Sequence, residues 1–340
     1  MAGAAPTKAP SVHVQPRRRS SAVVSPYDIE DVFPDDAATV RLPRQQSGST
    51  AQSLAVTLVT DYTLRTHAWL PSASIVALLG EAGIGSSAAR TAISRLSRRG
   101  VLESSRDGRY SSYRLTPAAI GNLAAGGAWI AGFATRADPW DGFWTLVSFS
   151  FPQEERSQRR ALRGQLRWLG YAPLYDALWV SPDAPNPTVE DRLTAVTLGA
   201  MTMFRARHVE LATQTNRNPI DAWDIAAIAR RYNTFIQRWK PLLPRIRAGK
   251  VSGAAAVHAR TEIMDAYRHF PIIDPQLPIE LMPAHWPRAD AREVFVAVYD
   301  GLAEQAQEHV RAVVTQFSDS PCPEVQAHST ADMASASHTP

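Results

Sequence analysis

The stretch GIGSSAARTAISRLSRRG, at residues 83–100, restricts the fold more than any other part of this sequence. Gly83, Gly85 and Ala88 have the G-x-G-x-x-A spacing of a dinucleotide-binding turn. The same residues also suit the turn and second helix of a DNA-binding motif. The two interpretations require different structures on either side of the glycines, so the flanking sequence separates them.

The dinucleotide interpretation has partial support. Glu103 lies 20 residues after Gly83, where a carboxylate can bond a ribose hydroxyl. However, residues 71–82 have apolar side chains at helical spacing, whereas the motif needs a strand that runs into its first glycine. The Asp-Gly pair at 107–108 then indicates a hairpin instead of a crossover helix. An NAD(P)-dependent oxidoreductase that uses residues 83–88 is therefore the alternative hypothesis.

A helix over residues 86–99 would separate its side chains onto two faces. Its apolar residues gather on one side, and its serine, threonine and arginine residues gather on the other. No Asp or Glu occurs between Ala82 and Leu102, although four arginines do. Arginine can form paired hydrogen bonds with guanine, and hydroxyl groups bond phosphates or bases. A serine N-cap and Gly100 are expected to bound this helix, and a solvated basic face is the ordinary alternative interpretation.

Two short strands at 101–105 and 109–115 are expected to follow this helix as a hairpin. Arg106, Arg109 and Tyr110 would lie at or near its tip, where a wing meets the DNA backbone or minor groove. Together, these elements predict a winged helix-turn-helix. The predicted DNA-contacting residues are Ser86, Ser87, Arg90, Thr91, Ser94, Arg95, Arg98, Arg99, Arg106, Arg109 and Tyr110.

The sequence as a whole predicts an α+β protein of three folded domains between two tails. Residues 1–46 and 319–340 are rich in Pro, Ala and Ser and are expected to be disordered. The winged-helix domain covers 47–125 and ends at a glycine-rich joint, AAGGAW. Strands and helices alternate over 126–216, which predicts a central α+β domain, and 217–318 has the spacing of a helical domain.

Composition limits other functions. The chain has 340 residues, a net charge of +4 and a single cysteine, Cys322, so an internal disulfide is impossible and a reducing cytoplasm is expected. No apolar run reaches membrane-spanning length. The nine histidines have no zinc-ligand spacing, and strand 143–151 carries no carboxylate. We therefore expect no metal, cofactor or catalytic residue; Asp141 is expected to cap a turn.

Some residues suggest an effector site without defining one. Arg159, Arg160, Arg163 and Arg167 follow helical steps and could hold phosphates of a CoA ester, although a solvated basic face is the favoured interpretation. Tryptophans of the central domain could stack on an aromatic ligand, but core packing is their more usual role. The effector-binding residues therefore stay unassigned.

Long stretches of the sequence resemble the PaaX family of transcriptional regulators. The resemblance extends from near Ser49 to Phe317 and covers about 270 of the 340 residues. It includes the helix, turn, helix and hairpin described above, the stretches WDGFWTLVSFSF and FRARHVE, and the loop DPQLPIELMPAHWP. The spacing A-x-R-T-A-x-S-R-L-x-R-x-G, which starts at Ala88, and the loop are together fairly specific for the family.

The resemblance implies a repressor that binds an inverted-repeat operator in double-stranded DNA as a homodimer. It implies a central domain similar to small ferredoxin-like CRISPR-associated nucleases. It also implies control of phenylacetate catabolism genes and release from DNA by phenylacetyl-CoA or a related acyl-CoA. Ser86–Arg99 match the recognition helix and Arg106–Tyr113 match the wing. Asp265 and Ala266 depart from the His-Glu pair expected there, and a non-catalytic interaction protein with a degenerate winged helix is the third hypothesis.

Overall fold

The computed structural model describes residues 50–335 with short gaps. The gaps fall at 109, 136–138, 151–155, 186, 197–199, 211–216 and 319–323. The predicted N-terminal tail, Cys322 and Arg109 therefore lie outside the described residues. The description contains helices and two antiparallel sheets, which confirms the predicted α+β class.

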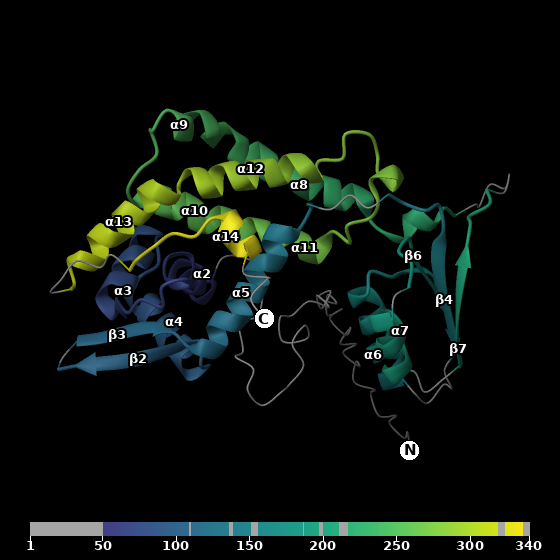
Figure 1. Cartoon of the computed structure of the whole chain (residues 1–340), viewed down its shortest axis with the longest axis horizontal. Helices are drawn as coiled ribbons and strands as arrows, with labels where there is room; N and C mark the ends of the chain where they lie inside the picture. Colours follow the sequence, from purple (N-terminus) through teal and green to yellow (C-terminus); the bar gives the residue numbers. More distant parts are fainter. Residues whose placement is uncertain are drawn as a thin grey trace, which may run out of the picture.

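Three helices and a small sheet form the first unit of the fold (Figure 1). The helices are α2 (Ala51–Thr63), α3 (Ser72–Glu81) and α4 (Ser86–Arg98). The strands are β1 (Leu70–Pro71), β2 (Leu102–Asp107) and β3 (Tyr110–Leu115). They pair antiparallel in the order β1-β3-β2. The helices and hairpin strands predicted here are all present, with bounds that differ by one or two residues.

Helix α5 (Pro117–Gly132) contradicts the predicted glycine-rich joint. Thr116 caps the helix by accepting a hydrogen bond from the Ala119 amide at 3.2 Å, and Pro117 occupies its first turn. The pair Gly126-Gly127 lies inside the helix instead of separating two domains. A Cβ atom at Gly127 would lie 3.4 Å from the Met333 side chain, so the glycine permits close packing there.

The second unit is a four-stranded sheet with two helices on one face. In chain order it contains β4 (Trp144–Ser150), α6 (Arg156–Trp168), β5 (Ala172–Tyr175), β6 (Leu178–Ser181), α7 (Pro187–Val196) and β7 (Ala200–Ala206). The strand order is β5-β6-β4-β7, with every pairing antiparallel. Leu162 and Leu166 of α6 pack on Val147 and Trp179, while Trp144 belongs to a cluster on the opposite face. Trp144 and Trp179 are thus core residues.

The C-terminal half is helical, as expected. It contains α8 (Ile225–Trp239), α9 (Leu243–Arg247), α10 (Ala254–Tyr267), α11 (Phe270–Ile273), α12 (Arg288–Gly301) and α13 (Ala303–Thr315). Short 3₁₀ turns occupy Pro219–Ala222, Lys240–Leu242 and Ile279–Leu281. Helix α8 buries Ile228, Tyr232, Phe235 and Trp239 along one face, whereas Ile225 at its start is partly exposed. Helices α12 and α13 follow each other directly and meet at Leu302.

One hydrophobic core joins α2–α5 to the C-terminal helices, although the sequence suggested separate domains. The cluster continues from α2 and α4 into α8, α10, α12 and α13. Polar contacts reinforce this junction. The Ser53 hydroxyl donates to Asp265 at 2.8 Å, and His309 of α13 lies 2.9 Å from the Glu81 carboxylate of α3. Movements of the C-terminal helices are therefore expected to reach α2–α4 directly.

The segment Glu324–Ser335, here called the C-terminal strap, crosses this junction and ends in α14 (Thr330–Ser335). The Gln326 amide donates to the Tyr62 carbonyl at 3.0 Å, and the His328 amide donates to the Asp61 carbonyl at 3.2 Å. Val325 and Met333 are buried. The prediction that 319–340 is disordered is therefore wrong for the strap.

A buried polar cluster lies beneath the strap. The Arg260 guanidinium is fully buried, donates to the carbonyls of Tyr299 and His328, and stacks 3.7 Å from the centre of the Tyr299 ring. The Tyr299 hydroxyl donates to the Asp61 carboxylate at 2.7 Å. Burial raises the pKa of Asp61 to about 6 and lowers the pKa of His328 to about 4. The cluster connects α2, α10, α12 and the strap.

Candidate nucleic-acid interface

The glycines of residues 83–85 shape the turn between α3 and α4. Gly83 has φ +81°; its amide donates to the Gly80 carbonyl, and the Ile84 amide donates to the Leu79 carbonyl, each at 2.9 Å. This pair of bonds around a left-handed residue is the Schellman ending of a helix. Gly85 is the N-cap of α4, with no side-chain cap, so the predicted serine N-cap is wrong by one position. Gly100, with φ +73°, ends α4 as expected.

This geometry contradicts the dinucleotide-binding alternative. A helix, α3, precedes the first glycine where the motif requires a strand. The following strands form an antiparallel hairpin and do not lead into a crossover helix. Glu103, the residue considered for a ribose hydroxyl, forms an ion pair with Arg114, which stacks over the Trp69 ring at 4.5 Å. The spacing G-x-G-x-x-A arises because Gly83 follows the end of α3 and Gly85 caps the start of α4, and it does not mark a dinucleotide-binding turn.

A pair of glycine substitutions tests whether Gly83 ends α3 in the left-handed conformation. Gly83→Ala is expected to destabilise the fold by about 1–2 kcal/mol, because alanine must adopt the left-handed conformation. Gly80→Ala is the matched control: Gly80 lies in helical α3 with open space around it, so alanine should stabilise by roughly 0.5–1 kcal/mol. Urea denaturation monitored by circular dichroism measures both. Equal effects at the two positions would contradict the assigned turn.

Helix α4 presents a polar face to solvent and an apolar face to the core. Ala89, Ala92, Ile93 and Leu96 are buried, as the predicted separation of faces requires. Among the described residues, Arg90, Arg95 and Arg98 have no ion-pair or hydrogen-bond partner. Arg99 differs, because it is half-buried and its Nη1 atom is enclosed. The exposed predicted residues on this helix are Ser86, Ser87, Arg90, Thr91, Ser94, Arg95 and Arg98.

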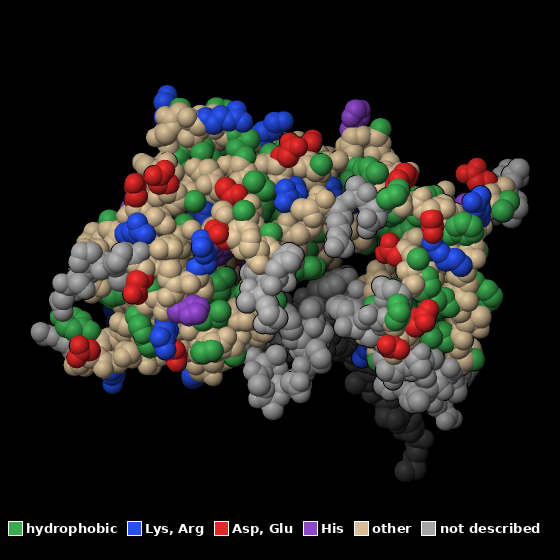
Figure 2. Space-filling model, in the orientation of Figure 1, with side chains coloured by type: hydrophobic (Ala, Val, Ile, Leu, Met, Phe, Trp, Pro, Cys, Tyr) green, Lys and Arg blue, Asp and Glu red, His purple; other side chains and the backbone are tan. Residues whose placement is uncertain are grey.

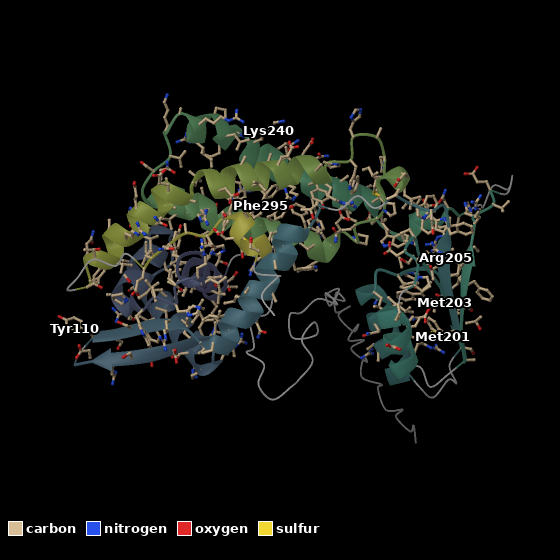
Figure 3. All side chains as sticks on the ribbon, viewed as in Figure 1. Tyr110, Met201, Met203, Arg205, Lys240 and Phe295 are labelled. Carbon is tan, nitrogen blue, oxygen red and sulfur yellow. The ribbon has the colours of Figure 1, made fainter. Side chains whose placement is uncertain are left out.

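The described residues of the hairpin include two further predicted contacts, Arg106 and Tyr110. Asp107 pairs with Tyr110, and Gly108 has φ +58° in the connecting turn. Tyr110 is 65% exposed and projects from the end of the hairpin (Figure 3). Arg106 is also exposed, on the face that carries buried Leu102, whereas the strand alternation puts Tyr110 on the opposite face. The two side chains would therefore reach a duplex from opposite sides of the hairpin.

Asp141 and two of the α6 arginines considered in the sequence analysis form contacts within the β4–β7 unit. Asp141 accepts a hydrogen bond from the Phe143 amide at 2.9 Å and pairs with Arg205, and these contacts hold its pKa below the usual range. It caps a turn, as expected. On α6, Arg163 donates to the Asp176 carbonyl at 3.2 Å and Arg167 stacks over Trp179. Within the described part of the chain, no three His, Cys, Asp or Glu side chains gather as a metal site would require.

Comparisons with known proteins agree with this architecture. Three family models match in succession: "PaaX-like protein" over 50–119, "PaaX protein central Cas2-like domain" over 137–217 and "PaaX-like protein C-terminal domain" over 223–312. The transcriptional repressor PaaX of Escherichia coli (strain K12) is 29% identical over 243 residues, which are 70% of this chain and 75% of the relative. The uncharacterized protein Rv0674 from Mycobacterium tuberculosis shares the fold, with a TM-score of 0.53 and 22% identity, over 77% of this chain and 99% of that one.

Fold and surface together define an α+β protein that carries an acid-free helix and a hairpin on a helical core. The chain belongs to the PaaX family, whose three models span it in order. This membership confirms the resemblance and the expectation that the protein is not an enzyme, since the relative named above is a transcriptional repressor. No helix in the described residues is long and apolar enough to cross a membrane.

Proposed function

We propose that this protein is a DNA-binding transcriptional repressor whose first unit acts as a winged helix-turn-helix. Helix α4 would enter the major groove and the β2–β3 hairpin would lie beside it as the wing. The observation that carries the proposal is the exposed face of α4: three arginines without a partner among the described residues, in a stretch free of acids from Ala82 to Leu102. A structural helix face of ordinary composition would mix both charges.

The packing of α4 supports this role. Its buried face fixes the helix against α2 and α3, so the exposed arginines are held on a rigid element. Rigid placement matters because paired hydrogen bonds to guanine require an accurate approach of the guanidinium. Phosphate contacts from the hairpin would then set the register of the protein on the duplex without reading sequence.

We further propose a homodimer on an inverted-repeat operator, with the β4–β7 unit as a ferredoxin-like domain. The order β-α-β-β-α-β and the sheet order β5-β6-β4-β7 support that assignment. A symmetric dimer would place two copies of α4 on successive turns of one duplex face. Sedimentation of the protein with and without operator DNA tests the dimer.

The effector is proposed to be phenylacetyl-CoA or a related acyl-CoA, and the regulated genes those of phenylacetate catabolism. The effector would release the protein from DNA if it binds the DNA-free conformation of the protein more tightly than the DNA-bound conformation. The core that α2–α4 share with the C-terminal helices supports transmission of such a change. Calorimetry with phenylacetyl-CoA tests the ligand. No heat of binding at high concentration would remove it, and would leave the DNA-binding proposal standing.

Replacement of Arg90 by alanine tests the DNA face. We expect operator binding to weaken by about 1–3 kcal/mol, or about 5- to 150-fold, if this arginine bonds guanine, and binding to unrelated DNA to change little. Gel shifts with the DNA upstream of the protein's own gene, compared with a scrambled duplex, provide the measurement. Arg160→Ala on α6 removes the same charge from an exposed site elsewhere and is the control.

Three outcomes of this experiment separate the hypotheses. Operator affinity that falls only for Arg90→Ala supports a reading helix. Equal operator affinity for Arg90→Ala and the unmodified protein would show that α4 does not read the sequence. No affinity for any duplex, even at low salt, would favour the interaction protein with a degenerate winged helix.

A further inference from the structure

Another acid-free stretch, longer than the one around α4, runs from Ile225 to Thr261. It contains eight of the 36 Lys and Arg residues of the chain and none of its 32 Asp and Glu residues. The rest of the chain therefore has more acidic than basic residues, although the whole chain has a net charge of +4. The positive excess of the protein depends on this one segment.

Seven of these eight cations are exposed, the exception being buried Arg260. Arg238 pairs with Glu262 at 2.8 Å, and the side chains of the other six have no ion-pair or hydrogen-bond partner among the described residues. Blue side chains accordingly gather along the upper edge of Figure 2, over α8 and α9. We call this set the α8–α9 basic surface: Arg230, Arg231, Arg238, Lys240, Arg245, Arg247 and Lys250.

The part of this surface that follows α8 is anchored by its apolar residues. Leu242, Leu243 and Ile246 pack against the main core, and Ile246 lies so close to Gly301 that a Cβ atom there would be 3.1 Å away. Gly249 has φ +63°, and the Lys250 amide donates to the Arg245 carbonyl at 2.8 Å, which closes the turn. The cations between these anchors are thus displayed on an ordered element, as a binding surface requires.

The side chains of this segment indicate the kind of polyanion that fits. Over residues 225–261, all of which the structure describes, no large apolar or aromatic side chain is exposed. Single-stranded nucleic acid is normally held by stacking on exposed aromatic rings, and interfacial amphipathic helices insert an exposed apolar face into the membrane. The exposed amide side chains of α8, Asn233 and Gln237, instead suit hydrogen bonds to phosphates. Duplex DNA backbone matches this chemistry.

The basic surface lies far from the proposed reading helix. Lys240 and Tyr110 lie on different sides of the molecule in Figure 3, and α10 and α12 separate α9 from α2–α4 in Figure 1. We propose that the α8–α9 basic surface binds the phosphate backbone of a duplex segment other than the one held by α4, without reading its sequence. This inference rests on the proposed function in one respect: it assumes that α4 holds the first duplex segment.

The test compares two double variants of the full-length protein. Arg245→Gln with Arg247→Gln removes two charges from the surface, and Arg160→Gln with Arg207→Gln removes two exposed charges elsewhere as the matched control. Binding is measured across a salt series with a duplex limited to the operator, a non-operator duplex, a single strand and anionic vesicles. We expect the surface variant to lose affinity for non-operator duplex roughly tenfold at about 0.2 M salt, with a slope of log K against log salt smaller by about 1.8.

Affinity for the operator-limited duplex should stay unchanged in the surface variant, because α4 is intact. Unchanged non-operator binding and salt slope would overturn the inference, as would a loss equal to that of the control. A loss confined to single strands or vesicles would also overturn it and identify a different polyanion. Arg90→Ala isolates the proposed function: it should weaken operator binding alone, so the failure of either proposal is recognised separately.

Discussion

Arg260→Ala is expected to lower the free energy of unfolding by about 3–5 kcal/mol, because it removes one partner of a buried ionic cluster. The Arg260 guanidinium is fully buried and bonds the carbonyls of Tyr299 and His328. Its charge also lowers the pKa of Asp61, which burial otherwise raises. Without it, those carbonyls lose their donor and the Asp61 carboxylate lies uncompensated in the core.

Urea denaturation at neutral pH provides the measurement, with Arg238→Ala as the control. Arg238 lies on exposed α8 and forms one ion pair with Glu262, an arrangement that contributes about 1 kcal/mol or less. A loss for Arg260→Ala no larger than that of the control would mean that solvent reaches the cluster, and that the strap does not cover it.

Met333→Ala is the second large effect expected, with a loss of about 2–5 kcal/mol, the range for truncation of a buried methionine. Met333 lies in α14 of the strap, is buried and packs against Gly127 of α5. The cavity cannot close easily, because Gly127 has no side chain that could move into the space.

The same experiment discriminates between an ordered and a disordered strap. If residues 324–335 were disordered, Met333 would be exposed to solvent and its truncation would leave the unfolding midpoint unchanged. Ser335→Ala, an exposed position in the same helix, is the control and should shift stability by less than about 0.5 kcal/mol. Thermal and urea denaturation of the two variants side by side gives the comparison.

The sequence predicts the helices and the hairpin of the first unit well because its signals there are local. Apolar spacing identifies the buried face of α4, and Gly83 and Gly100 mark helix ends through bonds to residues within one turn. The Asp-Gly pair identifies the hairpin for the same reason. The sequence does not distinguish Arg99 from the exposed arginines of α4, because burial of its Nη1 atom depends on neighbours that helical periodicity does not specify.

The parts that sequence reasoning missed depend on contacts between distant segments. Gly126-Gly127 suggested a joint because glycine usually interrupts helices, whereas its neighbour Met333 comes from the other end of the chain. Val325 and Met333 are isolated apolar residues in a Ser- and Ala-rich stretch, so no periodicity revealed their burial. The α8–α9 basic surface does have a local signal, the absence of acids over 225–261, but this absence matches no known motif.

The strap also bears on how the protein is made. Helix α2 leaves the ribosome early, but the backbone donors that bond its Asp61 and Tyr62 carbonyls belong to residues 326–328. At roughly 5–20 residues per second, synthesis of the intervening chain takes roughly 15–50 s. During that interval, the core beneath α4 is incomplete, because α8, α10, α12, α13 and finally the strap are still being added. A chain released before Glu324 would carry the proposed DNA-reading helix on an incomplete core, so the stability of this helix depends on synthesis of the strap.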